Sequence, residues 1–360
     1  TDRADELAVV IAQHLMDAID VSSADDPDLT ELRRRAAGFL SQAASRACAL
    51  GSYRDGLRLF RLAISHSDDD STRVELLEEA ADAAMVLGEY SAMSELSGEA
   101  LALRDAAGDP LLAARAVQLH GQALIFAGDQ SVAAELLEDR YARILALPHA
   151  DAARQRILHA MVLLFVYFDP ANPRALQLAH DRVRLASRLE DGLQLTQALA
   201  NLATVESYHG SDEVAEALYH HVVQRSLQLN DWRTLAVAQG NLTDQNMARS
   251  PQAAIEIAES AVTTARDHGL HAHSETIAIN LVMALWSAGR WERLSTIMQD
   301  LVDPAIPHDP QSQSTVMAVD LWRVDAGLEP LAAQLTLPPS DDLQEEAWQR
   351  HLHKIGRAHV

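Results

Sequence analysis

The chain has 360 residues, and acidic residues outnumber basic ones by 52 to 29, giving a formal net charge of −23. A surface this acidic repels phosphate backbones and anionic lipids, so we expect neither nucleic acid nor a membrane as the partner of this region. Aromatic residues make up only 4% of the chain, while Ala and Leu are abundant, which favours helices over a large sheet or barrel. The single cysteine, Cys48, excludes an intramolecular disulfide and fits a reducing compartment, so we expect the cytoplasm.

Residues 1–28 form the first predicted segment. An apolar stretch at residues 6–15 has helical character, and an acidic loop at residues 25–28 follows it. The repeating pattern begins only after this segment.

Residues 29–337 show an internal repeat with a period of about 40 residues, marked by short glycine turns. The turn glycines are Gly51, Gly88, Gly128, Gly210, Gly289 and Gly327. Where a glycine is skipped, proline-containing turns at residues 169–173 and 249–251 keep the period. Apolar residues before each turn recur with helical spacing, so each unit is predicted to be two helices. Because one such hairpin cannot bury its apolar face alone, seven to eight of them are expected to stack into an all-α, right-handed superhelix.

Several side chains mark predicted helix starts. Asn172 and Ser250 each stand before a proline at the first helical position, and Asp109 does the same where a new unit begins. Thr72 has capping-box spacing to Glu75. The aspartates at residues 68–70 lack the glycine and the glutamate of a calcium loop, so we expect them to flank the start of a helix.

The residues around the first turn resemble the second half of a tetratricopeptide (TPR) repeat. Tyr53 matches the aromatic residue after the turn, Gly56 the small residue of the second helix, Phe60 its large apolar residue and Ala63 the next small one. The period exceeds the usual 34 residues and the closing proline is mostly missing. The pattern is therefore most similar to the long-helix TPR regions of large bacterial signalling proteins.

The junction at residues 1–28 resembles the segment that follows the ATPase module in such proteins. It is similar to bacterial proteins built as a class III nucleotide cyclase, an AAA-type ATPase and a TPR array. Relatives that carry a LuxR-type or transcription-activator module share the same ATPase–TPR arrangement. The resemblance therefore implies that an ATPase lies upstream and leaves open whether the parent protein is a cyclase or a transcriptional regulator.

Three asparagines, Asn201, Asn241 and Asn280, repeat with the period of the units. In the TPR family this position faces the concave groove, where an amide can bind the backbone of an extended peptide. Gln245 lies one helical turn after Asn241 and Tyr208 two turns after Asn201, and both are expected to share that face. The alternative is that the asparagines hydrogen-bond between stacked helices and satisfy buried polar groups.

The sequence contains no pattern of a catalytic or cofactor site. It has no phosphate loop, no HExxH pair and no GxSxG elbow, and its only lysine is Lys354. A cluster of His268, His271 and His273 beside Glu275 could bind a transition metal, but residues 267–273 are better explained as a polar loop between units. We therefore predict no catalytic residue, no cofactor and no metal in this region.

Both ends of the chain suggest a fragment of a longer protein. Residue 1 is Thr1, no signal peptide or membrane span is visible, and the most apolar run, residues 157–168, is too short to cross a bilayer. Residues 338–353 are predicted to begin a further helix. Residues 354–360 match one reading frame of a common sequencing adapter, so we expect them to be an artefact.

The sequence thus predicts a non-catalytic sensor or interaction scaffold in bacterial signal transduction. Its partner would be a protein, a peptide or the upstream ATPase or cyclase domains of the same chain, with a small-molecule effector as a further option. The alternative function is the ligand-sensing TPR region of a LuxR-type or related ATPase-containing transcriptional regulator.

Overall fold

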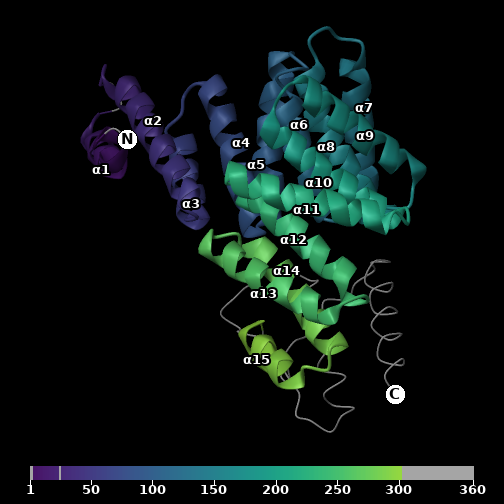
Figure 1. Ribbon diagram of the computed structural model, residues 1–360. Coiled ribbons are helices and arrows are strands. Elements are labelled where there is room, and N and C mark those ends of the chain that lie inside the picture. Colours follow the sequence, from purple (N-terminus) through teal and green to yellow (C-terminus); the bar gives the residue numbers. More distant parts are fainter. Residues whose placement is uncertain (1–2, 24–25, 302–360) are drawn as a thin grey trace. The chain divides into compact units, whose positions relative to one another are not determined.

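The computed structural model describes residues 3–23 and 26–301, and within these ranges every regular element is a helix (Figure 1). The first helices are α1 (Arg3–Val21), α2 (Leu29–Ala49), α3 (Tyr53–Ser65), α4 (Asp70–Leu87), α5 (Tyr90–Ala107), α6 (Ala114–Phe126), α7 (Gln130–Leu145) and α8 (Asp151–Phe168). The remaining ones are α9 (Pro173–Arg188), α10 (Gly192–Tyr208), α11 (Asp212–Leu229), α12 (Trp232–Met247), α13 (Pro251–Asp267), α14 (His271–Ser287) and α15 (Trp291–Leu301). The predicted all-α architecture is confirmed.

The helices from α2 to α15 form seven hairpins in the described part of the chain, as the 40-residue period predicts. Glycine turns join the two helices of most hairpins. Gly88, at the end of α4, has φ 75°, and Gly128, after α6, has φ 84°. Only glycine adopts this left-handed conformation without steric cost, so the turn glycines mark the true helix ends. The predicted turn at Gly327 and the predicted segments 338–353 and 354–360 lie outside the described residues.

The chain divides into two compact units. In the described residues, the first comprises the chain up to Ala238 together with Ala265–Ala272, and the second comprises Gln239–Thr264 and residues 273–301. Helices α1 to α11 belong wholly to the first unit. It is therefore the larger of the two in the described residues, and it contains most of the hairpins.

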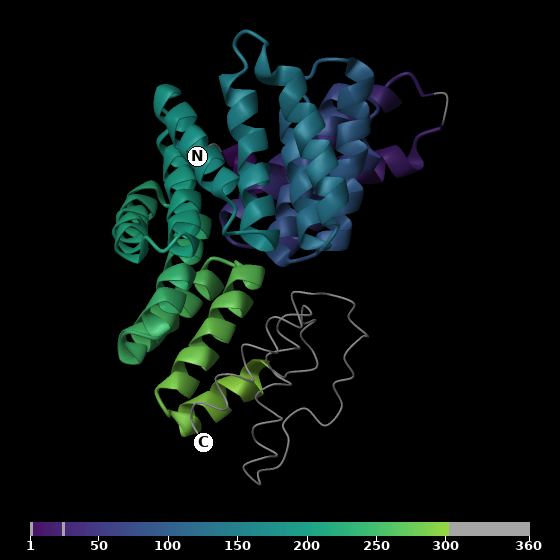
Figure 2. The same ribbon diagram turned by 90° about the vertical axis from the view of Figure 1, so that its right-hand side faces the viewer.

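Two layers of helices build the first unit. Each helix from α1 to α6 packs on the next one, and α4, α6, α8 and α10 also contact one another in succession (Figures 1 and 2). No comparably close pair joins α5 to α7 or α7 to α9 in this part of the chain. When a two-layered array curves, the helices of the concave layer come closest together. We therefore call α4, α6, α8 and α10 the inner layer.

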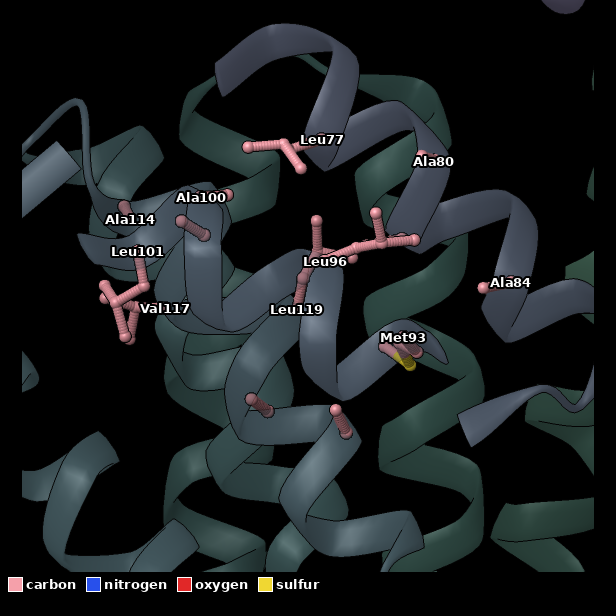
Figure 3. Close-up of a cluster of buried hydrophobic side chains, with 14 of the residues drawn as sticks. Leu77, Ala80, Ala84, Met93, Leu96, Ala100, Leu101, Ala114, Val117 and Leu119 are labelled. Atoms are coloured by element: carbon pink, nitrogen blue, oxygen red, sulfur yellow. The ribbon is translucent and has the colours of Figure 1, made fainter. Parts of the chain in front are cut away.

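Leucines and small residues fill the space between the layers (Figure 3). Leu77 and Ala80 of α4 meet Met93 and Ala100 of α5 in a cluster where every one of these side chains is fully buried. Alanine permits close approach of the helices, and leucine and methionine fill the gaps that remain. The alternation of small and large residues thus makes tight hairpins from helices with few aromatic residues.

The first hairpin shows why one of the TPR-like positions requires glycine. A Cβ atom on Gly56 of α3 would overlap the Cys48 Sγ and would lie 3.2 Å from the Ala44 carbonyl oxygen of α2. Phe60 and Ala63 follow on the same helix and are buried, with exposed fractions of 1% and 0%. These positions pack as the resemblance to a TPR repeat implies.

Three predicted boundaries are wrong. Helix α4 begins at Asp70 and its cap is Asp69, whose carboxylate accepts a hydrogen bond from the Thr72 amide at 2.8 Å, so Thr72 is inside the helix rather than at its cap. Asp109 accepts from the Leu111 amide, but a turn intervenes and α6 begins only at Ala114. The predicted loop at residues 267–273 is shorter, because α13 ends at Asp267 and α14 begins at His271.

The apolar run at residues 157–168 lies within α8, and Ile157, Leu158 and Met161 are among its buried residues. Within the described residues, no helix combines the length and the apolar character needed to cross a bilayer.

Candidate functional site

The helices of the inner layer carry several buried polar side chains among their buried apolar residues. At its beginning, Glu78 of α4 is 2% exposed. Its carboxylate lies 3.1 Å from the Arg104 Nε and 3.9 Å from the Arg115 Nη1, while Arg115 also lies 2.7 Å from Glu79. A buried carboxylate between two guanidiniums is compensated, so this part of the layer needs no external partner.

Amide side chains link successive helices further along the inner layer. Gln155 of α8 donates a hydrogen bond from Nε2 to the Gln194 Oε1 of α10 at 2.8 Å. The Gln118 Nε2 of α6 and the His159 Nδ1 of α8 are 3.4 Å apart. Each contact joins residues separated by about one repeat period. Gln155 is 2% exposed, so these contacts link neighbouring inner helices at a regular spacing.

His159 lies among positive charges. Its pKa is well below the usual histidine range, first because of burial and then because of the guanidiniums of Arg182, Arg233 and Arg156. The imidazole is therefore neutral at physiological pH. A neutral histidine can accept or donate a hydrogen bond without adding to the local charge.

Arg182 of α9 is fully buried behind α10. Its Nη1 donates to the Gln197 carbonyl oxygen at 3.1 Å and to the Asn201 Oδ1. The Nε and Nη2 atoms are buried and have no hydrogen-bond partner. Burial lowers the pKa of Arg182 to about 9, so its charge persists at neutral pH without a carboxylate beside it.

The predicted binding residues of the first unit differ in exposure. Asn201 is 9% exposed and its amide oxygen is engaged by Arg182, whereas Tyr208 at the end of α10 is 53% exposed. The contact of Asn201 fits the alternative in which this asparagine satisfies a buried polar group. Only Tyr208 of this pair offers most of its side chain to a ligand.

The second unit contains the other three predicted residues. Asn280 of α14 donates from Nδ2 to the Gly240 carbonyl oxygen of α12 at 3.1 Å, while Asn241 of α12 is half-buried. Gln245, one turn later on α12, has both amide atoms buried with no hydrogen-bond partner. Asn241 and Asn280 are each the tenth residue of their helix, as Asn201 is of α10. The repeat thus fixes their register, while their hydrogen bonds differ.

The possible metal cluster is not assembled. The His268 ring stacks on the Trp232 ring with a centroid separation of 3.9 Å and an interplanar angle of 9°. Among the described residues, no three histidine, cysteine or acidic side chains come together in a way that would hold a metal ion.

Sequence reasoning missed Arg156, His159 and Arg182. His159 stood out only as a polar residue in the apolar stretch of α8, and Arg182 as one of many arginines. The available signal was the spacing of Gln118, Gln155 and Gln194, which follows the period of the repeat. That spacing marks inner helices, but it does not show which arginine points between the layers.

No protein-family model matches the sequence, and no curated protein matches it. Among solved structures, the chain is similar to a Signal Transduction ATPase with Numerous Domains (STAND) protein with a tetratricopeptide repeat sensor from Pyrococcus horikoshii, with a TM-score of 0.50 and 11% identity. That alignment covers 99% of this chain and 53% of the other, so this chain spans about half of its length. BtubC from P. vanneervenii is similar at a TM-score of 0.46 and 16% identity, over 64% of this chain and 93% of the other. A Rap protein complexed with Competence and Sporulation Factor is similar at a TM-score of 0.44 and 11% identity, over 99% of this chain and 88% of the other. Together with the helix pairs described above, the likeness to the STAND protein identifies the fold as a TPR-like helical repeat.

Proposed function

We propose that the chain is a non-catalytic sensor or scaffold that binds a protein or peptide on its inner helices and regulates an ATPase or nucleotide cyclase in bacterial cytoplasmic signalling. The observation that carries the proposal is the series of polar side chains joining successive inner helices. Gln155 and Gln194 are the clearest example, because they join α8 to α10 through their side chains at 2.8 Å. Gln155 is 2% exposed, so this pair marks the regular spacing of polar side chains along the layer, and the ligand contacts are proposed at the more exposed polar residues of the repeat.

The likeness to a STAND ATPase supports the regulatory part of the proposal. That protein carries a tetratricopeptide repeat sensor, and the likeness extends over 99% of this chain. The resemblance of residues 1–28 to a segment that follows an ATPase module points in the same direction. We therefore propose that the array senses a ligand and passes the signal to an ATPase in the same protein.

Selection of a random peptide library on the purified chain tests the binding function. We expect selected peptides to lose affinity when Asn241→Ala or Gln245→Ala is introduced, because these two residues of α12 are the predicted peptide contacts and both amide atoms of Gln245 lack a hydrogen-bond partner. Gln228→Ala is the matched control, since this exposed glutamine lies on α11 and is not among the predicted peptide contacts. Peptide affinity that is equal in all three variants would contradict the assignment of this face.

Asn280→Ala separates the two roles considered for the asparagines. Its hydrogen bond to the Gly240 carbonyl oxygen predicts a lower melting temperature when the amide is removed. A variant that melts normally but no longer binds selected peptides would instead assign Asn280 to the ligand.

Sequencing the source DNA outward from the fragment tests the regulatory context. A phosphate loop and paired cyclase aspartates upstream would support the cyclase-linked function. A helix-turn-helix module would support the alternative, a LuxR-type or related transcriptional regulator. A start codon immediately before Thr1, with no ATPase, would contradict both and leave a free-standing adaptor.

A further inference from the structure

Aromatic rings from three successive hairpins pack in a row at one edge of the first unit. The ring of Tyr90, at the start of α5, lies 4.8 Å from the ring of Phe126, at the end of α6, measured between centroids. The Phe126 ring in turn lies 5.6 Å from that of Tyr167, near the end of α8, in an edge-to-face arrangement. Phe126 and Tyr167 are about one repeat period apart, so the row follows the repeat.

Tyr208 has the next position in this row by its register. It follows Tyr167 by about one repeat period and is the last residue of α10, which contacts α8 in the inner layer (Figures 1 and 2). In a stack of equivalent hairpins, the turns that follow the inner helices all lie at the same edge. We call Phe126, Tyr167 and Tyr208, together with the segments that follow them up to residue 213, the aromatic edge.

The exposure of the rings increases along the aromatic edge. Phe126 is half-buried between Tyr90 and Tyr167, whereas Tyr167 is 41% exposed and Tyr208 is 53% exposed. Large aromatic side chains that recur at the surface are typical of a site that binds a partner. The packed part of the row therefore holds Tyr167 in place, and the two tyrosines provide accessible ring surface.

The segments that follow the three rings are acidic. They contain Asp129, Asp169 and Glu213, all exposed, and no lysine or arginine. None of these three carboxylates forms an ion pair in the described part of the chain, and Asp169 accepts a hydrogen bond from the neutral Asn172 amide at 2.8 Å. The dipole of a helix that begins here offsets only about half an elementary charge. Each segment therefore keeps negative charge close in sequence to an aromatic residue.

We propose that the aromatic edge binds a basic peptide segment, whose arginine side chains stack on Tyr167 and Tyr208 and pair with the carboxylates of Asp169 and Glu213. The face of an aromatic ring attracts a cation, and the planar guanidinium group can also stack on it. This inference rests on the proposed function and adds the chemical class of the peptide and the edge of the array that receives it.

The chain itself contains the kind of contact that this proposal requires. The guanidinium carbon of Arg174 lies 5.8 Å from the centroid of the Phe165 ring of α8. The Arg174 Nη2 also lies 2.5 Å from the carboxylate of Glu138 on α7. One arginine is thus engaged by an aromatic ring and a carboxylate together, and we expect the arginines of the ligand to be bound by the same combination.

The net charge of the chain argues against other occupants of the aromatic edge. A second copy of the chain would bring a further formal charge of −23, and a nucleic acid or an anionic membrane would bring phosphate groups. Each of these would be repelled by the unpaired carboxylates. Charge complementarity therefore favours a basic segment of another protein.

Fluorescence anisotropy of a labelled peptide of alternating arginine and glycine, titrated with the whole chain at physiological ionic strength, tests the proposal. Tyr167→Ala and Tyr208→Ala should each weaken binding about threefold, and the double variant about tenfold, because each change removes a cation–π contact. Tyr167→Phe combined with Tyr208→Phe should bind like the parent, since both ring faces remain. All these changes leave the charge of the chain unaltered, so a loss cannot come from general electrostatic attraction. Unchanged affinity in the double alanine variant would overturn the proposal.

Leu145→Ala is the matched control for the tyrosine variants. Leu145 is 53% exposed, as Tyr208 is, but it lies at the end of α7 that is remote from the Phe126–Asp129 turn. Its replacement should leave peptide affinity unchanged, and the melting temperatures of all variants verify that they fold. A peptide of alternating lysine and glycine should bind more weakly than the arginine peptide, because an ammonium group cannot stack on a ring. Equal affinity for the two peptides would refute the stacking.

Two charge variants test the part of the carboxylates. Asp169→Asn and Glu213→Gln should each weaken binding of the arginine peptide about threefold. Glu135→Gln, at an exposed position on α7 outside the aromatic edge, should leave the affinity unchanged. Equal losses in the three variants would assign the binding to net charge and count against a defined site.

The variants of α12 keep this inference separable from the proposed function. If binding of the arginine peptide is lost in the double alanine variant but retained in Asn241→Ala and Gln245→Ala, the aromatic edge is supported and the amide contacts are not. Selected peptides without basic residues, which lose affinity in Asn241→Ala but not in the tyrosine variants, would leave the peptide-binding function intact and overturn the aromatic edge.

Discussion

Arg233 and Asp82 form an ion pair although 151 residues separate them in the sequence. The Arg233 Nη1 lies 3.1 Å from both carboxylate oxygens of Asp82, so the start of α12 contacts α4 within the first unit. The turn glycines Gly51 and Gly269 also meet in this unit, where a Cβ atom on Gly269 would overlap the Gly51 carbonyl oxygen. The first unit therefore brings distant hairpins into direct contact, and one charge pair lies at that contact.

The Asp82–Arg233 pair should contribute measurably to stability. Both side chains are about one-third exposed, so solvent screens the interaction and we expect a coupling free energy of about 1 kcal/mol. A double-mutant cycle with Asp82→Asn and Arg233→Gln, followed by urea unfolding, measures it. The matched control is the Asp55–Arg58 pair of α3, whose side chains are more than 60% exposed and should show almost no coupling. Equal couplings for the two pairs would contradict this interpretation.

Gly56→Ala should destabilise the protein by about 1–3 kcal/mol, because the added methyl group would clash with the Cys48 Sγ and the Ala44 carbonyl oxygen. Gly38→Ala is the control within the same hairpin. Gly38 is inside α2 and nothing lies within 4 Å of the position that a Cβ atom would take there, so alanine should stabilise the protein by up to about 1 kcal/mol. Chemical unfolding of both variants measures the difference. If Gly56→Ala changed the free energy of unfolding as little as Gly38→Ala does, α2 and α3 would not approach each other as closely as described at Gly56.

The Cys48 thiol should react slowly in the folded protein. Burial raises its pKa to about 11, and the charges of Asp82 and Glu79 act in the same direction. At pH 8 the thiolate fraction is then about 100-fold lower than for an ordinary cysteine, and the thiolate is the reactive form. Alkylation with iodoacetamide should therefore be about 100-fold slower in the native chain than in urea, and should accelerate up to about pH 11. Similar alkylation rates at pH 8 in the native chain and in urea would show that Cys48 is accessible and has the pKa of an unperturbed cysteine.

Asp69→Ala should lower the urea midpoint, because the carboxylate caps α4 by accepting hydrogen bonds from the Thr72 amide and hydroxyl. The hydrogen bond from the Thr72 side chain is the largest influence that lowers the pKa of Asp69. A carboxylate with a depressed pKa in the folded state stabilises that state above its unfolded pKa. This contribution is lost as the pH falls through the folded value. The gap between parent and variant should therefore close in acid.

Asp68→Ala is the control for the cap. Asp68 lies 3.8 Å from Arg33 with more than half of its side chain exposed, and it does not cap α4. Its replacement should leave the urea midpoint nearly unchanged at every pH. If Asp68→Ala lowered the urea midpoint as much as Asp69→Ala does, the effect would come from the loss of a negative charge near the start of α4 and not from the helix cap.

The first and second hairpins show which features of this fold the sequence predicts correctly and which feature it misplaces. Gly51 and Gly88 marked real turns, and Phe60 and Ala63 occupy the buried positions that a TPR repeat requires. The start of α4 was misplaced because Asp69 and Thr72 both have capping chemistry, and sequence spacing does not show which of the two acts.

The candidate site was harder to predict for a different reason. The equal register of Asn201, Asn241 and Asn280 follows from the repeat, yet Asn201 bonds to Arg182 and Asn280 to the Gly240 carbonyl oxygen. These partners come from other helices. Equivalent sequence positions can therefore have different surroundings.

The sequence by itself determined the helices, their turns and the repeat period, because capping, left-handed glycines and apolar spacing act over a few residues. Only the tertiary structure decided that Arg182 is buried without a carboxylate and that Arg233 reaches Asp82. Both outcomes depend on how successive hairpins pack, since that packing sets which distant side chains share a region of low dielectric. Sequence patterns that extend over a few residues do not predict that packing.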